Sequence, residues 1–178
     1  MRASHEEFER LVAAYERRIF NVALKLTGNT DDAADLTQET FLRAFKSLGN
    51  FRGDSAKYTW LYRILVNLNK DRIGREVRRR ERETSMDSGG AAYGPVDLAD
   101  AGETPIREAE LTETRGALAE AIQALPDGYR ECVVLRDVEG LSYDEIAEVM
   151  EITVEAVRSR LARARQQLRQ RLAPYLKA

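Results

Sequence analysis

The chain carries LSYDEIAEVM at residues 141–150 and TVEAVRSRLARAR at residues 153–165. Both segments repeat apolar residues at the three- and four-residue spacing of one helix face, and only two residues separate them. Ser142 is followed three residues later by Glu145, which is the pattern of a capping box at a helix start. Most arginines of the second segment fall off its apolar face. Together these features predict a helix-turn-helix, in which the second helix enters the major groove of DNA.

Apolar periodicity predicts further helices before this motif. A first helix ends at Gly28, and a second begins with Thr30 as its N-cap and runs to about Leu48. A third begins near Thr59 and turns basic towards its end. Residues 111–140 carry two more helical patterns. No strand pattern competes with them, so the predicted fold class is all-α.

A segment rich in glycine, proline and acidic residues interrupts this pattern after residue 84. It has few large apolar side chains and no periodicity, and a structureless stretch of this length inside one domain is unusual. We therefore expect two small helical domains, residues 1–84 and residues 111–178, joined by a flexible acidic linker over residues 85–110. Because this linker would let the domains move independently, we expect the free chain to bind DNA weakly.

The net charge of −2 hides a strong segregation of charge along the chain. Residues 70–82 carry seven basic groups against three acidic ones, and residues 154–172 carry six arginines against Glu155. Residues 83–110, in contrast, carry seven acidic groups and only Arg107 as a base. Two basic patches separated by an acidic stretch indicate two contacts with a polyanion.

Composition excludes several other classes of protein. His5 and Cys132 are the only histidine and cysteine, so an internal disulfide and a zinc site of the usual kind are excluded. We expect Cys132 to be a buried, inert thiol because it lies in an apolar run. No apolar run reaches the ~18 residues of a membrane span, and the N-terminus does not resemble a signal peptide. We expect a cytoplasmic protein without metal or cofactor.

Three longer segments carry a family resemblance. They are DAADLTQETFLRAF at residues 32–45, FRGDSAKYTWLYRILVN at residues 51–67, and residues 125–168 with the helix-turn-helix. In this order, the segments resemble an extracytoplasmic-function (ECF, group IV) sigma factor of the sigma-70 family, the promoter-specificity subunit of bacterial RNA polymerase. The resemblance implies a protein that directs core polymerase to specific promoters, aids promoter melting and is not itself an enzyme.

The first segment resembles the polymerase-binding helix of the family. Asp35 and Glu39 are one helical turn apart and share a face, with Gln38 beside them. The resemblance implies that these three residues dock on the clamp helices of the largest polymerase subunit, where basic partners would meet the carboxylates. Taken alone, such an acidic pair is more often a solvated helix face. An enzymatic carboxylate cluster is the remaining alternative, and no histidine is available to partner it.

The second segment and the basic helix after it resemble the part of the family that captures the −10 element as a single strand, with one base flipped into a pocket. Base flipping costs a few kcal/mol, and stacking on an aromatic ring returns about 1–3 kcal/mol. The residues that the resemblance assigns to −10 DNA are Phe51, Arg52, Ser55, Tyr58, Asn67, Lys70, Arg72 and Arg75. Asn67 would contact a base edge, and the basic residues would hold phosphates. Trp60 lies among core residues, so we expect it to pack rather than to stack on DNA.

The third segment resembles the −35 reading domain. The residues that the resemblance assigns to −35 DNA are Arg136, Arg158, Ser159, Ala162, Arg163 and Arg165. Arginine suits a bidentate contact with guanine, whereas Arg136 and Arg165 fit phosphate contacts better. The sequence also departs from the commoner pattern. Glu151 stands in the turn where glycine is frequent, so the turn must form without the conformational freedom of glycine. Glu155, at the start of the second helix, would repel nearby phosphates.

The resemblance also implies partners. They are the polymerase core, promoter DNA and an anti-sigma factor, the usual inhibitor in this family. The main alternative is a stand-alone helix-turn-helix regulator, which would dimerise to bind two half-sites and would bind duplex DNA tightly without polymerase. A carboxylate-dependent hydrolase is a third possibility.

Overall fold

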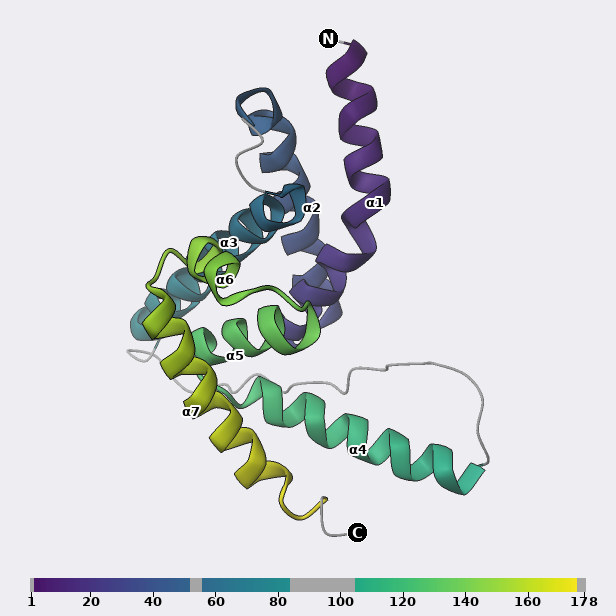
Figure 1. The fold of residues 1–178 in the computed structure, drawn as a ribbon, viewed down its shortest axis with the longest axis vertical. Coiled ribbons are helices and arrows are strands. Elements are labelled where there is room, and N and C mark those ends of the chain that lie inside the picture. Colours follow the sequence, from purple (N-terminus) through teal and green to yellow (C-terminus); the bar gives the residue numbers. More distant parts are fainter. Residues whose placement is uncertain (1, 52–55, 84–104, 176–178) are drawn as a thin grey trace.

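The computed structural model describes residues 2–51, 56–83 and 105–175. Within these ranges every regular element is a helix, which confirms the all-α prediction (Figure 1). The N-terminal half contains α1 (Arg2–Thr27), α2 (Thr30–Ser47), the short 3-10 turn η1 (Leu48–Asn50) and α3 (Lys57–Glu83). The C-terminal half contains α4 (Pro105–Gln123), α5 (Asp127–Val133), the π-helical turn η2 (Val134–Val138), α6 (Tyr143–Met150) and α7 (Val154–Leu172).

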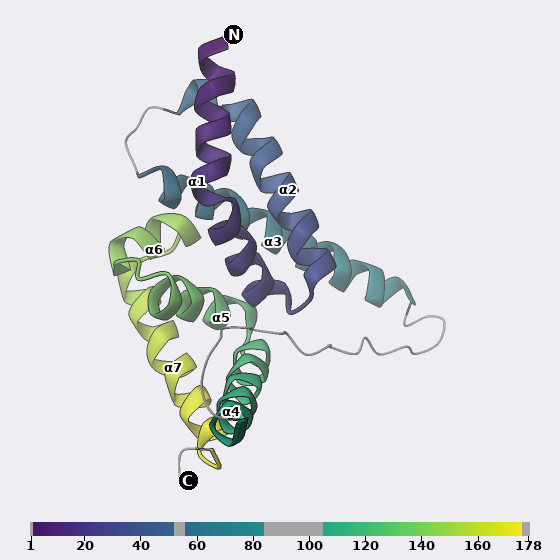
Figure 2. The ribbon, with the colours of Figure 1, turned by 90° about the vertical axis from the view of Figure 1, so that its right-hand side faces the viewer.

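The N-terminal half is a hairpin of α1 and α2 that α3 crosses on one side (Figure 2). Gly28 makes the hairpin turn with a φ of 78°, which a residue without Cβ adopts at little cost. Asn29 is the N-cap of α2, because its side-chain oxygen accepts a hydrogen bond from the backbone N–H of Asp32 at 2.8 Å. The prediction of Thr30 as N-cap is therefore wrong by one residue. The buried centre of this half contains Ile19, Val22, Leu36, Leu61 and Leu65.

The junction between α2 and α3 lies close to the predicted position. Helix α2 ends one residue before Leu48, and α3 begins at Lys57, two residues before the predicted start. The rings of Phe51 and Trp60 lie against each other with their centroids 4.9 Å apart. Trp60 also packs on the hydrophobic core, as its place in the apolar pattern predicts.

Helices α6 and α7 form the predicted helix-turn-helix. The hydroxyl of Ser142 accepts from the N–H of Glu145 at 3.2 Å, and the Glu145 carboxylate accepts from the N–H of Ser142 at 2.7 Å, which confirms the capping box. Thr153 caps α7 by accepting from the N–H of Ala156 at 3.1 Å. The two helices pack through buried Ile146, Val149, Val157, Leu161 and Ala164.

The turn between α6 and α7 uses a left-handed residue although it contains no glycine. Glu151 has a φ of 57° and ends α6, with its N–H bonded to the carbonyl of Ala147. It is the only described residue other than glycine with a positive φ. The chain therefore keeps the turn geometry that glycine would favour and bears the conformational cost of a side chain there.

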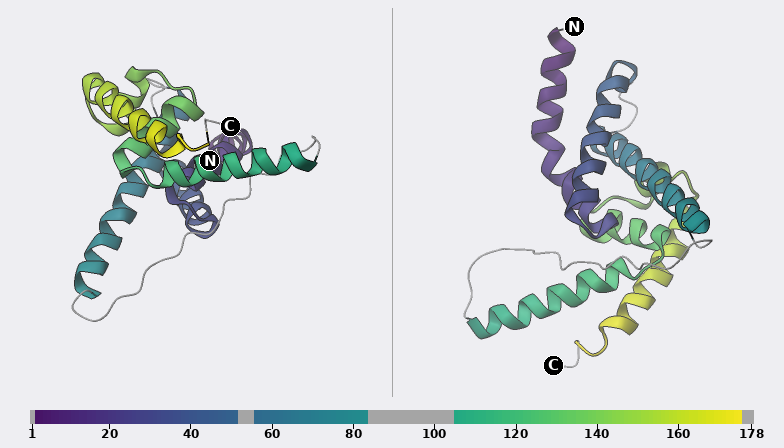
Figure 3. Two further views of the ribbon diagram at one scale, coloured as in Figure 1. Left: turned by 90° about the horizontal axis from the view of Figure 1, so that it is seen from below. Right: turned by 180° about the vertical axis from the view of Figure 1, so that it is seen from behind.

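Most of the expected linker, residues 84–104, lies outside the described residues. Residues 105–110, which were also expected to be linker, belong to α4, so this helix begins earlier than the sequence pattern indicates. In both panels of Figure 3 the N-terminal part of α4 extends away from the other helices.

The two halves pack against each other. Helix α3 contacts α6, and α1 contacts α4, α5 and η2 (Figures 1 and 2). Buried side chains of both halves belong to one continuous hydrophobic cluster. The halves are thus in contact in this structure, and the expectation that they move independently stays a prediction. It rested on the linker composition, which carries no information about contacts between the domains that it joins.

Arg130 of α5 anchors this arrangement at the ends of two helices. Its guanidinium donates to the carbonyls of Ile122, Gln123 and Leu125 at 2.6–3.2 Å, and to the carbonyl of Leu26, at the end of α1, at 3.0 Å. The side chain of Gln123 donates to the carbonyl of Lys25 at 2.7 Å. Carbonyls at a helix C-terminus lack partners within their own helix, so these contacts satisfy groups that would otherwise need water.

The turn at residue 151 generates a stability prediction. Glu151→Gly should make the protein more stable than Glu151→Ala by about 1 kcal/mol, because only glycine avoids the Cβ penalty in the left-handed region. Both variants lose the exposed contact between the Glu151 carboxylate and Arg63 Nε, 3.7 Å apart, so their difference isolates the backbone effect. Urea unfolding would measure it. Equal stability of the two variants would contradict a conformational cost at this position.

Candidate nucleic-acid interface

The acidic face of α2 is displayed on the surface. Asp35 and Gln38 are exposed and make no hydrogen bond or ion pair with any described residue. Glu39 is half-buried, and its carboxylate accepts from Arg43 Nε at 3.2 Å one turn further along the helix. The structure thus brings the three predicted polymerase-binding residues together on one face, two of them available for a partner.

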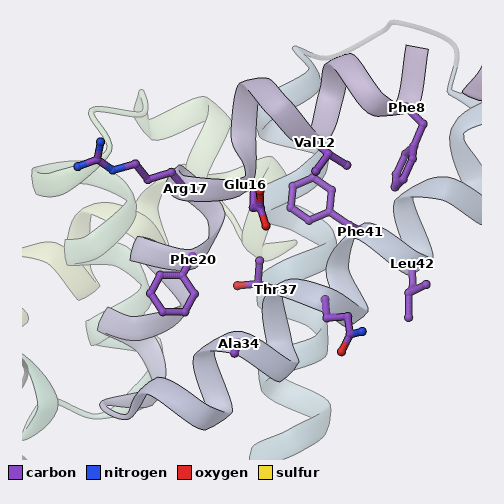
Figure 4. Close-up of a pocket in the computed structure, with 10 residues that line it drawn as sticks. Phe8, Val12, Glu16, Arg17, Phe20, Ala34, Thr37, Phe41 and Leu42 are labelled. Atoms are coloured by element: carbon purple, nitrogen blue, oxygen red, sulfur yellow. The ribbon is translucent and has the colours of Figure 1, made fainter. Parts of the chain in front are cut away.

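An apolar groove of about 560 Å³ lies beside this face, between α1 and α2 (Figure 4). Phe8, Val12 and Phe20 of α1 line one side, and Phe41 and Leu42 of α2 line the other. Gln38 also lines the groove, so the acidic face continues directly into an apolar surface. Apolar periodicity predicts the two helices but does not separate core positions from positions that line a groove, so this groove was not predicted.

The residues predicted to contact −10 DNA are found in different environments on and before α3. Arg52 and Ser55 lie outside the described residues. Asn67 is half-buried and Arg75 is exposed. Arg72 takes part in an internal network, with its Nη1 atom 3.1 Å from the Asp32 carboxylate. Phe51 packs against Trp60 as described above.

Two of the predicted −10 residues are engaged by the C-terminal half. The hydroxyl of Tyr58 donates to the carboxylate of Glu145 in α6. Lys70 Nζ donates to the carbonyl of Met150 at the end of α6, at 3.1 Å. The face of α3 that was predicted to bind DNA is therefore covered, in part, by the helix-turn-helix.

A polar cluster between the halves was not foreseen. The carboxylate oxygen Oε2 of Glu139 accepts from Arg18 Nε at 2.7 Å and from the hydroxyl of Tyr62 at 2.6 Å. Arg18 also donates to the backbone carbonyl of Glu139 at 3.3 Å and lies 5.8 Å from the centre of the Tyr58 ring. The spacing of Tyr58 and Tyr62, one turn apart on α3, was the only sequence signal for this cluster.

The cluster shifts the ionisation of its members. The hydrogen bond from Tyr58 holds the pKa of Glu145 below its ordinary value. Burial is the main cause of a raised pKa at Tyr62, and its hydrogen bond to Glu139 adds to the shift. The bond to Glu139 also raises the pKa of Arg18. All three shifts favour carboxylates and neutral phenols at neutral pH, so the cluster consists of donors around anions.

Glu131 is a second buried carboxyl at this boundary. It lies on α5, is only 2% exposed, and has an Oε1 atom 3.5 Å from Asn69 Nδ2 of α3. Burial raises its pKa to about 7, although Lys70, the hydrogen bond from Asn69 and Arg160 oppose the shift. Asp127 acts in the same direction as burial. This group therefore titrates near neutral pH, unlike an ordinary glutamate.

The recognition helix α7 presents an open face. Arg158, Ser159, Ala162 and Arg163 are all exposed, although the two halves are packed together. Among the residues that the structure describes, the Arg163 guanidinium makes one long contact, of 3.5 Å, with the hydroxyl of Tyr129. The arrangement leaves the predicted −35 surface accessible, in contrast to the predicted −10 surface.

Two of the predicted −35 residues are held by their own domain. Arg136 donates to the carbonyl of Leu141 at 2.7 Å, and its guanidinium lies 5.1 Å from the centre of the Tyr143 ring. Arg165 is paired with Asp137, with Nε 3.1 Å from Oδ2. Arg165 is therefore not a free cation, and a phosphate contact there would have to compete with Asp137.

The described part of the chain contains no cluster of three histidine, cysteine or acidic side chains placed to hold a metal. Cys132 is buried, as expected, and burial raises its pKa to about 11. None of the described helices combines the length and apolar character needed to cross a membrane.

Comparisons with known proteins match both halves. The family described as "Sigma-70 region 2" matches residues 11–80, and the family described as "Sigma-70, region 4" matches residues 115–168. The RNA polymerase sigma-H factor of Pseudomonas aeruginosa is 37% identical over 99% of this chain and 91% of its own length. The ECF RNA polymerase sigma-E factor of Haemophilus influenzae is 35% identical over 95% of this chain and 89% of its own length.

Two solved structures share the fold. The sigma factor RpoE of Bartonella quintana, in complex with the anti-sigma factor NepR, superposes with a TM-score of 0.74 at 23% identity, covering 94% of this chain and 98% of that one. CnrH in complex with the cytosolic domain of CnrY gives a TM-score of 0.65 at 26% identity, covering 96% of this chain and 90% of that one.

The raised pKa of Glu131 generates a prediction about pH. Between pH 4.5 and pH 7 the unfolded chain loses this proton while the folded protein keeps it, so stability from this group falls as pH rises and then levels off. The free energy of unfolding should fall by about 3 kcal/mol, because it changes by about 1.4 kcal/mol for each pH unit between the pKa of the unfolded chain and that of the folded protein. Urea unfolding of Glu131→Gln at pH 5 and pH 8 should lack this fall. An unchanged pH dependence in the variant would assign it to other groups.

Proposed function

We propose the function of this chain from one premise: it belongs to the sigma-70 family, as an ECF sigma factor of RNA polymerase. It acts in promoter-specific transcription initiation. The observation that carries this conclusion is the match of region 2 to residues 11–80 and of region 4 to residues 115–168, in the order of the family, together with a relative that aligns with 99% of the chain. A stand-alone helix-turn-helix regulator would not account for region 2.

Each half would bind different parts of the polymerase–promoter complex. Residues 1–84 would bind core polymerase and the −10 element and help to melt the promoter, and residues 111–178 would bind the −35 element. The polymerase would form the phosphodiester bonds in the cytoplasm, so we assign no catalytic step to this chain. Docking on polymerase would set the spacing of the halves, after which the second DNA contact becomes effectively intramolecular.

The surface that would dock on polymerase is the face of α2 with Asp35, Gln38 and Glu39. Exposure of the first two supports this assignment, because an unpaired carboxylate and amide are free to meet basic partners on the clamp helices. The adjoining apolar groove would add buried area at the same interface.

The surface that would contact the −35 element is the exposed face of α7. Arg158 and Arg163 fit base or phosphate contacts in the major groove, and Ser159 and Ala162 leave room for the groove to approach. Tyr58, Asn67, Lys70 and Arg75 would contact the −10 strand from α3. Arg72, Arg136 and Arg165 have partners in the structure and would serve less directly.

An anti-sigma factor is a further partner that we propose. Solved relatives are named as complexes with an anti-sigma factor or with the cytosolic domain of CnrY. Such an inhibitor would block the polymerase and DNA surfaces of this chain until a signal releases it.

The direct test is run-off transcription by purified core polymerase on a promoter library, with and without this protein. New start sites that appear only when the protein is present would support the function. Transcripts that start at the same positions in both reactions, whatever the template, would refute it.

The α2 surface generates a prediction about polymerase. Asp35→Ala combined with Glu39→Ala should weaken binding to core polymerase about tenfold or more, because both carboxylates would face basic partners. A matched control is Glu120→Ala with Glu148→Ala, which removes two exposed carboxylates from the C-terminal half. Fluorescence anisotropy of labelled protein titrated with core polymerase would measure the effect. Equal affinity of the test and control variants would defeat the assignment.

The α7 surface generates a prediction about promoter selectivity. If Arg163 contacts a guanine, Arg163→Ala should lower transcription about tenfold from promoters with that base pair and abolish preference there. Arg169→Ala, at an exposed position two turns further along α7, is the control. Run-off assays on single-base variants of the −35 element would show the pattern. A uniform loss across all variants would mean that Arg163 contacts only phosphate.

A further inference from the structure

One face of α3 carries a row of polar groups that all point to the C-terminal half. Tyr58, Tyr62 and Asn69 follow each other at helical spacing and Lys70 comes next to Asn69; each of the four donates to a group 62–87 residues away in sequence. Arg63 on the same helix lies 3.7 Å from the carboxylate of Glu151. Helix α3 thus presents donors, and the C-terminal half supplies mainly carboxylates.

Two tyrosines of this row, Tyr58 and Tyr62, form an anion-binding cluster together with Arg18 of α1. Arg18 Nε and the Tyr62 hydroxyl converge on one carboxylate oxygen of Glu139, at 2.7 and 2.6 Å. Tyr58, whose ring lies next to Arg18 and Tyr62, donates to a second carboxylate, that of Glu145. Charge-assisted hydrogen bonds of this kind bind carboxylate and phosphate oxygens alike.

We propose that Arg18, Tyr58 and Tyr62 form a phosphate-binding site for the single-stranded −10 DNA, and that Glu139 and Glu145 occupy this site while the two halves are closed. The proposal rests on the proposed function. It adds Arg18 and Tyr62 to the DNA-binding residues and makes the C-terminal half a competitor of the promoter strand.

Continuity with the predicted −10 surface favours nucleic acid as the ligand. Tyr58 belongs both to that surface and to the cluster, and Lys70 lies on the same side of α3 three turns further along. The exposed Arg75 and Arg78 extend the positive charge along the helix. A backbone with one phosphate per nucleotide can follow the whole length of such a row, whereas a single carboxylate of a protein partner would satisfy only part of it.

The free-energy change on replacing these carboxylates by phosphates would be small, because each donor of the cluster keeps an anionic acceptor. Arg130 need not break its bonds within the C-terminal half, since only its contact with the Leu26 carbonyl crosses the boundary to α1. The exposed face of α7 remains available in the closed form. The free protein would thus be competent for duplex contacts but not for strand capture.

The test compares three forms of the full-length chain. Glu139→Gln with Glu145→Gln removes both competing charges, and glutamine at residue 145 preserves the capping box. Asp144→Asn with Glu148→Gln changes the net charge equally at exposed positions of α6, the helix that contains Glu145. Affinity for a random single-stranded DNA pool is measured by fluorescence anisotropy, and opening of the halves by small-angle X-ray scattering.

We expect the first variant to expand and to bind single-stranded DNA about tenfold more tightly than the wild type, with the control unchanged. Adding Arg18→Gln or Tyr62→Phe to the first variant should remove most of this gain. The gain should be competed by inorganic phosphate at millimolar concentration.

Three results would overturn the proposal. In one, the expanded variant binds single-stranded DNA no better than the wild type. In another, the gain survives loss of Arg18 and Tyr62, or is competed by oligoglutamate but not by phosphate, which would assign the cluster to a protein partner. In the third, the halves stay closed even in Glu139→Lys, which places a cation beside Arg18. Run-off transcription by the wild type tests the proposed function separately, so failure of one claim is distinguishable from failure of the other.

Discussion

The carboxylate of Glu139 is shared between Arg18 and Tyr62, and the arrangement of the two halves depends on contacts of this type. The polar residues that join α3 to α5, Glu139 and α6 are phenols, an amide, an ammonium group and carboxylates, and they lie beside apolar side chains of both halves. Interfaces between domains that are this polar resemble transient protein–protein contacts more than a domain core. The polar part of this boundary therefore consists of bonds in which another anion could replace a carboxylate, beside apolar contacts that both halves share.

The hydrogen bonds within each half differ from those at the boundary between the halves. Arg130 ties the end of α4 to the start of α5 through several backbone carbonyls, and the capping box fixes the start of α6. Breaking these bonds would leave buried polar groups without partners, which is costly, whereas opening the boundary returns most groups to water. Because the bonds within each half are costlier to break than those at the boundary, the halves would separate before either of them unfolds.

The sequence alone was sufficient for the parts of the fold that depend on local patterns. Apolar spacing located the helices, and Ser142 with Glu145 marked the start of the helix-turn-helix. The N-cap at Asn29 was missed because Thr30 is an equally good capping type one residue away. The closed packing was not predictable, since bonds such as Arg18 to Glu139 join residues 121 positions apart. The same limit applies to Arg165, whose partner Asp137 comes from another helix, and to the α1–α2 groove, where core and surface positions share one apolar pattern.

The unequal exposure of α7 and α3 has a consequence for the protein in a crowded cell. Nascent transcripts and unwound DNA at replication forks offer abundant unpaired bases, and an uncovered donor row on α3 would adhere to all of them without regard to sequence. When α6 covers part of the donor row on α3 and the face of α7 stays exposed, this nonspecific binding to single strands would be reduced, and the protein could still diffuse along duplex DNA. If the proposed sites are right, the protein would bind the double helix first and the separated strand only after the C-terminal half has moved.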